Sequence, residues 1–339
     1  MTTADAEVIE HCVYHEGARL HVLDYPGKEP AIVLMHGFPD DHRIYDKLVT
    51  FLSPRRVVTF DWLGYGRSDR TEKVGSSAED HGSELKAVLD GLGITNAVLV
   101  GHDASGPDAV VFAAAHPDRV VHLVLLNTIF GHQPSLNLPE MIRLLADPAL
   151  TPLADAMVND ESQRLWLLQH TAAQWDMDAL DPEGLAVRCI LPQFFGDADQ
   201  PDAIAAIRAW TAELFDALDR QDALVDGEAL RRLDVPVSVI FGERDRYLTP
   251  TLATEIGGLF KDPSVHVVHN AGHWPQHDQP GVVAELVKRR EIAQRAGKLH
   301  TTDLSTQYTR TRTRRRFATD PQRNAGVPQR VVNHHLGQS

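Results

Sequence analysis

Short, Val-rich apolar runs alternate with helical patterns along most of this chain. Each run has four to seven residues and is bounded by turn residues, which is typical of strands buried on both faces of a parallel sheet. The runs are AIVLM (31–35), RVVTF (56–60), AVLV (97–100), VVHLVLL (120–126), VPVSVIF (235–241) and VHVV (265–268). Strands alternating with helices predict an α/β fold with a mostly parallel, doubly wound sheet.

Two earlier segments, residues 11–17 and 19–25, alternate between apolar and polar residues and predict a leading antiparallel pair. The strand pattern stops between about residues 131 and 233, where helical periodicity and Asp-Pro breaks replace it. We therefore expect an α/β core over 1–130 and 234–295 and an inserted helical cap over 131–233. Such a cap would overhang the carboxyl ends of the strands, where open α/β sheets bind ligands.

Residues 296–339 have no apolar periodicity and are predicted to form a basic, disordered tail. Residues 301–339 carry seven Arg against two Asp, whereas the whole chain has a net charge of −14. The first 300 residues are thus strongly acidic, which argues against nucleic acid as the main partner. A role for the tail in binding nucleic acid or an acidic partner is the weaker alternative.

The remaining composition limits the class of protein. Two cysteines are too few for a disulfide framework and show no metal-ligand spacing, so a reducing compartment is expected. The first residues show no basic start followed by an apolar run, and no stretch reaches the roughly 18 apolar residues of a membrane span. We expect a cytoplasmic protein with no membrane partner; its oligomeric state stays open.

The segment GHDASG (101–106) follows an apolar run directly and opens a helical pattern. A strand that ends in Gly-x-nucleophile-x-small-small makes a tight elbow, in which small residues permit close backbone approach. The pattern places Asp103 at the nucleophile position. Ser105 fits less well, because recentring the motif on it puts Asp103 and Pro107 at the small positions.

Two later segments add an acid and a base. Asp245, in FGERDRYLTP (241–250), follows the resumed strand, and His273, in NAGHWPQHDQP (270–280), follows the next one. The order nucleophile, acid, histidine is that of α/β-hydrolases. In MHGFPDD (35–41), the glycine turn can present the backbone N–H of Phe38, and the N–H of Ala104 would be the second donor of an oxyanion hole.

These motifs, together with DWLGYGRSD (61–69), resemble the α/β-hydrolase superfamily over roughly residues 10–290. Asp103 makes the chain most similar to the branch with an aspartate nucleophile, which includes haloalkane dehalogenases, fluoroacetate dehalogenases and soluble epoxide hydrolases. The resemblance implies an α/β-hydrolase fold with a catalytic triad of Asp103, Asp245 and His273.

An aspartate nucleophile selects the chemistry. Carboxylate attack on an ordinary ester would give a high-energy anhydride, whereas attack on an sp³ carbon that bears a leaving group gives a stable alkyl ester. Water activated by His273 would then hydrolyse the Asp103 ester. We expect a small apolar organic substrate and water as the reactants, with no metal and no organic cofactor.

The chain departs from its relatives at the leaving group. Residues 131–233 contain no tyrosine, although epoxide hydrolases of this type use two cap tyrosines as proton donors. The positions where haloalkane dehalogenases hold the halide are Ala104 and Phe38 here. Candidate substrate-binding residues in the cap are Trp175, the preferred one, and Trp166 and His170.

Three interpretations follow from these residues. The leading one is a dehalogenase-like hydrolase, because the cap offers indole N–H groups and lacks tyrosines. The first alternative is an epoxide hydrolase with an atypical proton donor. The second is a non-hydrolytic ligand-binding or biosynthetic homologue, against which the retained nucleophile, acid and base argue.

Overall fold

The computed structural model describes residues 8–71, 75–175 and 181–295, all within one compact unit, Met1–Gly297. The tail expected over residues 296–339 lies outside the described residues. The described part contains an eight-stranded sheet in the order β1-β2-β4-β3-β5-β6-β7-β8. The strands are β1 (Ile9–His15), β2 (Ala18–Tyr25), β3 (Lys28–Met35), β4 (Arg55–Phe60), β5 (Ala97–Asp103), β6 (Val120–Thr128), β7 (Val237–Gly242) and β8 (Pro263–Val268).

Every predicted run forms a strand of this sheet, and the fold class is confirmed. β1 pairs antiparallel with β2, as expected, and β2 pairs antiparallel with β4. The other neighbouring strands are parallel. β3, β5 and β6 lie in the middle of the sheet, which explains why their sequences are nearly continuous apolar runs.

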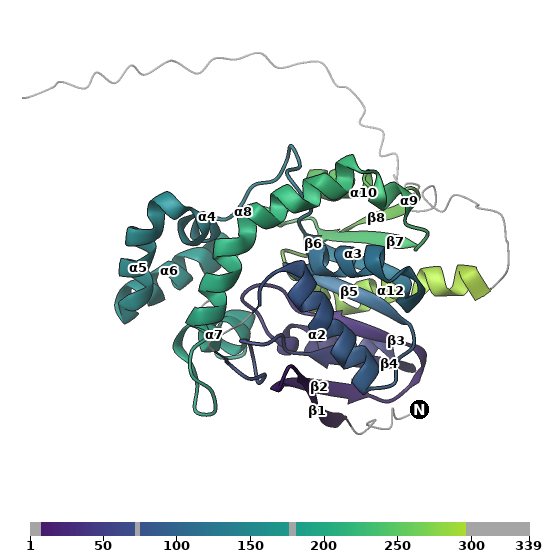
Figure 1. The fold of residues 1–339 in the computed structure, drawn as a ribbon, viewed down its shortest axis with the longest axis horizontal. Helices are drawn as coiled ribbons and strands as arrows, with labels where there is room; N and C mark the ends of the chain where they lie inside the picture. The colour runs from purple at the N-terminus through teal and green to yellow at the C-terminus, as the bar shows by residue number, and fades with distance from the viewer. Residues whose placement is uncertain (1–7, 72–74, 176–180, 296–339) are drawn as a thin grey trace, which may run out of the picture. The chain divides into compact units, whose positions relative to one another are not determined.

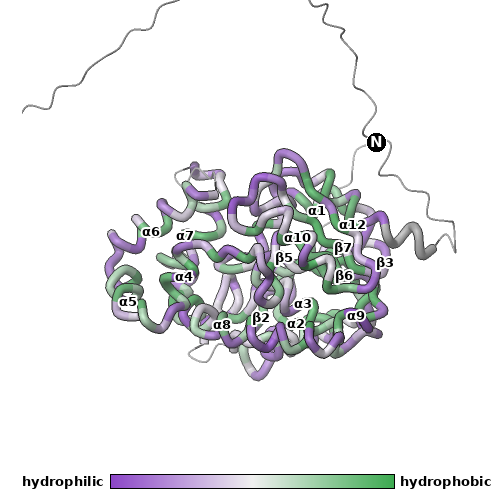
Figure 2. The backbone as a smooth tube through the Cα atoms, turned by 90° about the horizontal axis from the view of Figure 1, so that it is seen from above, coloured by the Kyte–Doolittle hydropathy of each residue, from purple (hydrophilic) through white to green (hydrophobic). Residues whose placement is uncertain are grey.

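Helices cover both faces of the sheet. In Figure 2, α2 and α3 lie on one side of β5, β6 and β7, and α1 and α12 lie on the other. The helices outside the segment between β6 and β7 are α1 (Asp46–Leu52), α2 (Ala78–Gly91), α3 (Ser105–Ala115), α10 (Pro250–Gly257), α11 (Pro275–Asp278) and α12 (Pro280–Arg295), with 3₁₀ turns η1 (His42–Tyr45) and η2 (Pro117–Arg119). This arrangement is the doubly wound architecture.

The described residues between β6 and β7 form helices and turns without a strand. Figure 1 shows α4, α5, α6 and α7 gathered beside the sheet rather than over its faces. The elements are α4 (Glu140–Ala146), η3 (Pro148–Leu150), α5 (Thr151–Asn159), α6 (Glu161–Gln174), η4 (Ala186–Ile190), α7 (Leu191–Phe195), α8 (Ile204–Asp226) and α9 (Ala229–Arg232). The helical character of this segment agrees with the expected cap, while the division of the chain into domains stays a prediction.

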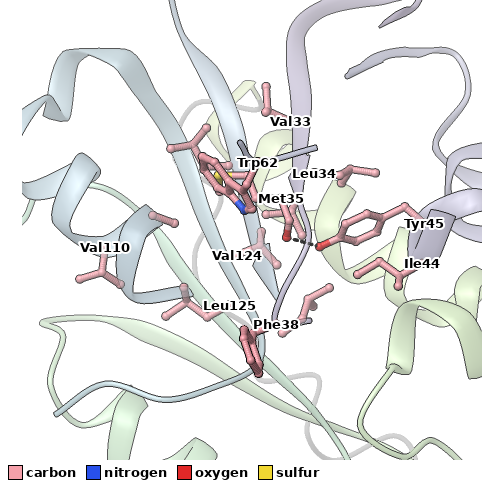
Figure 3. Close-up of a cluster of buried hydrophobic side chains, with 14 of the residues drawn as sticks. Val33, Leu34, Met35, Phe38, Ile44, Tyr45, Trp62, Val110, Val124 and Leu125 are labelled. Atoms are coloured by element: carbon pink, nitrogen blue, oxygen red, sulfur yellow. Dashed lines mark hydrogen bonds between the residues drawn. The ribbon is translucent and has the colours of Figure 1, made fainter. Parts of the chain in front are cut away.

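The hydrophobic core runs from the central strands toward the turn after β3. Figure 3 shows Val33, Met35 and Val124 from these strands packed in one buried cluster with Phe38. Tyr45 is also buried there, and its hydroxyl donates to the carbonyl of Met35 (2.7 Å), so its one polar atom is satisfied. The turn that carries Phe38 therefore stands on a packed core.

Strand register brings the candidate residues to one edge of the sheet. Met35 pairs with Phe60 and Gly101, and Asp103 pairs with Thr128. The parallel strands β3, β5, β6 and β7 thus end together, and the loops after them share one neighbourhood. Among the described helices, none combines the length and the apolar character that crossing a membrane requires.

Candidate active site

Asp103 ends β5 at a strained elbow. Its φ of 50° lies in the left-handed region, which costs a non-glycine residue of order 1–3 kcal/mol. A Cβ at Gly101 would lie 2.7 Å from the carbonyl oxygen of Ser105, and one at Gly106 would lie 2.0 Å from Oγ1 of Thr128. Gly101 is therefore required by close backbone approach, as the sequence predicted, and Gly106 by the side chain of Thr128.

The structure brings the three predicted triad residues together. His273 Nδ1 and Asp245 Oδ2 are 2.7 Å apart, a short hydrogen bond between buried groups. The other ring nitrogen, Nε2, lies 3.9 Å from Asp103 Oδ1. This distance exceeds a hydrogen bond, so Oδ1 of Asp103 is not occupied by the imidazole.

Asp245 is held by its surroundings in one orientation. Oδ1 accepts from the backbone N–H groups of Tyr247 and Leu248, both at 3.0 Å. Oδ2 accepts from Nδ2 of Asn127 (2.8 Å), and Oδ1 of Asn127 accepts from the N–H of Gly242 (2.9 Å). Sequence reasoning missed Asn127, although it follows the apolar run VVHLVLL at the same edge of the sheet.

The backbone N–H of Phe38 donates to Asp103 Oδ2 at 3.1 Å. The predicted donor therefore contacts the carboxylate. Oδ2, the oxygen that it binds, lies where an oxyanion on Asp103 would be stabilised. Ala104 lies at the N-cap of α3, next to Asp103. Its N–H as the second donor stays a prediction. Gly37 has no room for a side chain, since a Cβ there would lie 2.6 Å from Cβ of Asp103.

His102 and Asp40 form a second buried pair, next to the backbone of His273. Nε2 of His102 and the carbonyl oxygen of His273 are 2.9 Å apart, and Nδ1 of His102 lies 3.6 Å from Oδ2 of Asp40. The indole N–H of Trp274 donates to the same Asp40 oxygen (3.1 Å). These contacts fix the backbone that carries His273. They could not be predicted, since they join three distant segments.

The charges at the site shift the pKa values of the triad. Burial alone would lower the pKa of His273, but the negative charges of Asp245, Asp103 and Asp40 raise it to about 9. Burial tends to raise the pKa of Asp245, but His273 brings it below its ordinary value. Burial raises the pKa of Asp103, against the attraction of His273. At neutral pH, His273 is therefore an imidazolium paired with Asp245.

This ion arrangement predicts a pH-dependent stability. The folded-state pKa of His273 (about 9) exceeds the unfolded value of about 6.5. The ionised His273 therefore stabilises the fold fully below pH 6.5, and this contribution to the free energy of unfolding is lost as the pH rises through 9. The difference in unfolding free energy between the wild type and His273→Gln should fall by about 3 kcal/mol between pH 6 and pH 10. Urea unfolding measures it, with His170→Gln as the exposed-histidine control. A difference independent of pH would contradict the assignment.

A cavity of about 30 Å³ borders Asp103 and His273. Apart from these two residues, its walls are mainly apolar and aromatic: Phe38, Ile129, Leu138, Pro139, Ile142, Trp175, Trp210, Tyr247 and Leu248. A second cavity of about 40 Å³ shares Phe38 and Trp175 with it and is also mainly apolar. The site therefore suits a small apolar molecule.

The cap candidates differ in where they lie. The Trp175 ring stacks on His273, with centroids 5.3 Å apart, and its buried Nε1 has no hydrogen-bond partner in the described residues. Trp166 is 57% exposed and stacks on the exposed His170 instead. Neither Trp166 nor His170 lines the cavity beside Asp103, whereas Trp175 does. The reason is that α6 buries its opposite face through residues such as Leu167 and Leu168.

Two further aromatic residues, Trp210 and Tyr247, line this cavity. Trp210 of α8 stacks on Phe38, with ring centroids 4.2 Å apart, and so brings the helical segment onto the turn after β3. Tyr247 follows Asp245 in the loop after β7, and its hydroxyl donates to Glu140 at 2.5 Å. Both are aromatic side chains, but nothing in their local sequence distinguishes a cavity wall from a core.

The family model for the α/β hydrolase fold matches residues 30–280 of this chain. The chain belongs to the α/β-hydrolase fold family. This α/β hydrolase is 26% identical over 292 residues to epoxide hydrolase 3 of Xenopus tropicalis, covering 80% of this chain and 74% of that protein. It is 28% identical over 281 residues to haloalkane dehalogenase 2 of Mycobacterium tuberculosis, covering 80% and 91%.

Among solved structures, a haloalkane dehalogenase loop variant from Bradyrhizobium elkanii superimposes on this α/β hydrolase with a TM-score of 0.68 at 18% identity. The match covers 86% of this chain and 99% of that one, and it supports the fold. The family and the relatives establish a hydrolase of the α/β fold. They do not select between displacement of halide and opening of an epoxide.

Proposed function

We propose that this α/β hydrolase displaces a leaving group from an sp³ carbon through an alkyl ester on Asp103, with a halide as the preferred leaving group. One observation carries the proposal: a carboxylate occupies the nucleophile elbow, with Oδ2 bound by the N–H of Phe38 and Oδ1 3.9 Å from Nε2 of His273. A carboxylate in this position forms a stable ester with carbon, rather than an anhydride with an acyl group.

In the first step, Oδ1 of Asp103 attacks the carbon, the carbon–halogen bond breaks, and the halide leaves with the bonding electrons. Oδ2 becomes the carbonyl oxygen of the ester and stays at the N–H of Phe38. The reaction needs no proton, so the protonated state of His273 at neutral pH does not oppose it.

The first step prepares the base for the second. Forming the ester removes the negative charge of Asp103, which at about 4 Å stabilises the imidazolium of His273 by about 4 kcal/mol at an effective dielectric constant of about 20. The pKa of His273 therefore falls, and the ring releases its proton. Neutral His273, oriented by Asp245, then takes a proton from the water that attacks the ester carbonyl carbon.

The second step closes the cycle. The tetrahedral oxyanion develops on Oδ2, where the N–H of Phe38 donates to it, and Ala104 is the proposed second donor. Collapse of this intermediate releases the alcohol and restores the Asp103 carboxylate. The sum is a haloalkane plus water giving an alcohol, a halide ion and a proton.

Trp175 is the proposed stabiliser of the leaving group. Its indole N–H is buried and unpartnered among the described residues, and its ring lines the cavity beside Asp103. An unsatisfied buried donor is costly, and a departing anion would satisfy it. The stack on His273 also fixes the plane of the indole.

The epoxide alternative requires a proton for the opening ring. Tyr247 lines the cavity, but its hydroxyl is bound to Glu140, and burial together with that carboxylate raises its pKa to about 12. It is thus a poor acid. The imidazolium of His273 would be the atypical donor, which keeps epoxide opening as the second candidate and agrees with the likeness to an epoxide hydrolase.

The indole N–H can be tested without disturbing its ring stack. Trp175→Phe retains a ring over His273 and should lower kcat for 1-bromoalkanes by about 10²-fold, the usual effect of removing one donor to a developing anion. Halide release measures the rate, and Trp166→Phe, on the exposed face of α6, is the matched control. Equal losses in both variants, or no loss in either, would assign the leaving group to other residues.

A further inference from the structure

Outside the catalytic cavity, two histidines and an aspartate converge in the interior. His21 lies on β2, His42 begins η1, and Asp61 directly follows β4. Nδ1 of His21 is 3.4 Å from Asp61 Oδ2, and Nδ1 of His42 is 2.9 and 3.0 Å from the two Asp61 oxygens. The side chains of His21 and Asp61 are at most 1% exposed, and that of His42 is 9% exposed.

The far side of the His21 ring is held by a hydrogen bond to Glu10. Nε2 lies 3.0 Å from Oε1 of Glu10, and a carboxylate can only accept, so Nε2 carries a proton. Nδ1, on the other side of the ring, points into the cluster and lies 3.4 Å from Oδ2 of Asp61. This buried atom has no hydrogen-bond partner among the residues that the structure describes.

The carboxylate of Asp61 is fixed and cannot turn away from Nδ1 of His21. Oδ1 accepts from the N–H of His42 (2.8 Å), and Oδ2 accepts from the N–H of Arg67 (2.9 Å). A Cβ at Gly66, whose φ is 51°, would lie 2.3 Å from the same carboxylate. The backbone therefore holds Asp61 Oδ2 opposite Nδ1 of His21, and a cation between them would contact both atoms.

We propose that His21, His42 and Asp61 bind one divalent transition-metal ion, with Zn²⁺ as the best-matched candidate. Two imidazoles and one carboxylate form a common donor set for Zn²⁺. Ligand atoms about 2.05 Å from a tetrahedral ion are about 3.3 Å apart, and the measured separations to Asp61 oxygens agree within about 0.4 Å. The carboxylate of Glu10 on His21 is the outer partner that metal-binding histidines usually have.

Such an ion would act on structure rather than on the reaction. It would join β2, η1 and the segment after β4, and η1 begins three residues after the Phe38–Pro39 turn. None of the three ligands lines the cavity beside Asp103. The inference therefore does not depend on the proposed function, and a metal-free enzyme should retain its reaction with a lower resistance to unfolding.

The test measures metal binding by the full chain. Chelator-treated protein is titrated with Zn²⁺ against a competing indicator dye, and with Co²⁺, whose visible absorption reports tetrahedral nitrogen and oxygen ligands. We expect one Zn²⁺ bound per chain, a Co²⁺ absorption band and a higher melting temperature with Zn²⁺ than with chelator.

Variants assign the ion to the cluster. Glu10→Gln, at a side chain that is 56% exposed, should weaken Zn²⁺ binding about 10- to 100-fold without unfolding the protein. His21→Gln should remove the Co²⁺ band. The control is His132→Gln, which disrupts the exposed group of His132, Asp219 and Asp222; it should leave the affinity unchanged.

Two results would overturn the proposal. One is the absence of stoichiometric Zn²⁺ binding by the folded wild type. The other is binding that survives Glu10→Gln and His21→Gln at full affinity but is lost in His132→Gln, which would assign the ion to the exposed group.

Discussion

Asp103→Asn is expected to lower kcat by about 10⁴-fold or more, because the amide that replaces the carboxylate is a poor nucleophile toward carbon. The variant keeps the shape of the side chain, and asparagine tolerates the left-handed φ of 50° better than most residues. The hydrogen bond from the N–H of Phe38 can still be accepted by the amide oxygen. The loss should therefore reflect chemistry rather than folding.

The measurement is halide release from a 1-bromoalkane, combined with circular dichroism to verify the fold. Asp219→Asn, at an aspartate that is 77% exposed, is the control and should retain wild-type activity. A folded Asp103→Asn variant that kept a tenth of the wild-type rate would exclude Asp103 as the nucleophile.

His273→Asn is expected to stop the enzyme after its first step. Asparagine cannot take a proton from water, but Oδ1 of Asp103 can still attack the substrate, since it is not bound to the imidazole. Removing the positive charge of His273 also takes away an attraction that lowers the pKa of Asp103, so the burst is measured across a series of pH values. We expect a burst of one halide per chain, followed by turnover about 10⁴-fold slower than in the wild type.

The control for this variant is His170→Asn, which changes an exposed histidine of α6 and should show steady turnover. Steady turnover in His273→Asn would mean that another group activates water. A folded variant without a burst would mean that His273 is needed before the ester forms, as expected if its imidazolium opens an epoxide.

The sheet and the elbow could be predicted because each rests on a local pattern. The central strands β3, β5 and β6 are buried on both faces, so each is an apolar run with little alternation. The glycines at 101 and 106 mark the elbow in the sequence because a side chain at Gly101 would collide with backbone and one at Gly106 with Thr128. In a parallel sheet, residues that follow strand ends meet, which placed Asp245 and His273 beside Asp103.

The other features of the site could not be predicted, because they depend on contacts between distant segments. Asn127 supports Asp245 across more than a hundred residues, and nothing in its own neighbourhood signals that bond. Helical periodicity in α6 indicates two faces but not which one is buried, so the sequence could not exclude Trp166 from the cavity. The ligands proposed for a metal ion come from β2, η1 and the segment after β4, with spacings unlike a known metal motif.

The covalent ester on Asp103 is the central claim, and the intact mass of His273→Asn tests it most directly. The variant is exposed separately to a 1-bromoalkane and to an aryl epoxide, and the modified peptide is then mapped. We predict one alkyl group per chain, located on Asp103, after the bromoalkane. A hydroxyalkyl group on Asp103 after the epoxide alone would establish epoxide opening with a proton donor other than His273. An unmodified mass with both substrates, or an adduct on any other residue, would contradict the account.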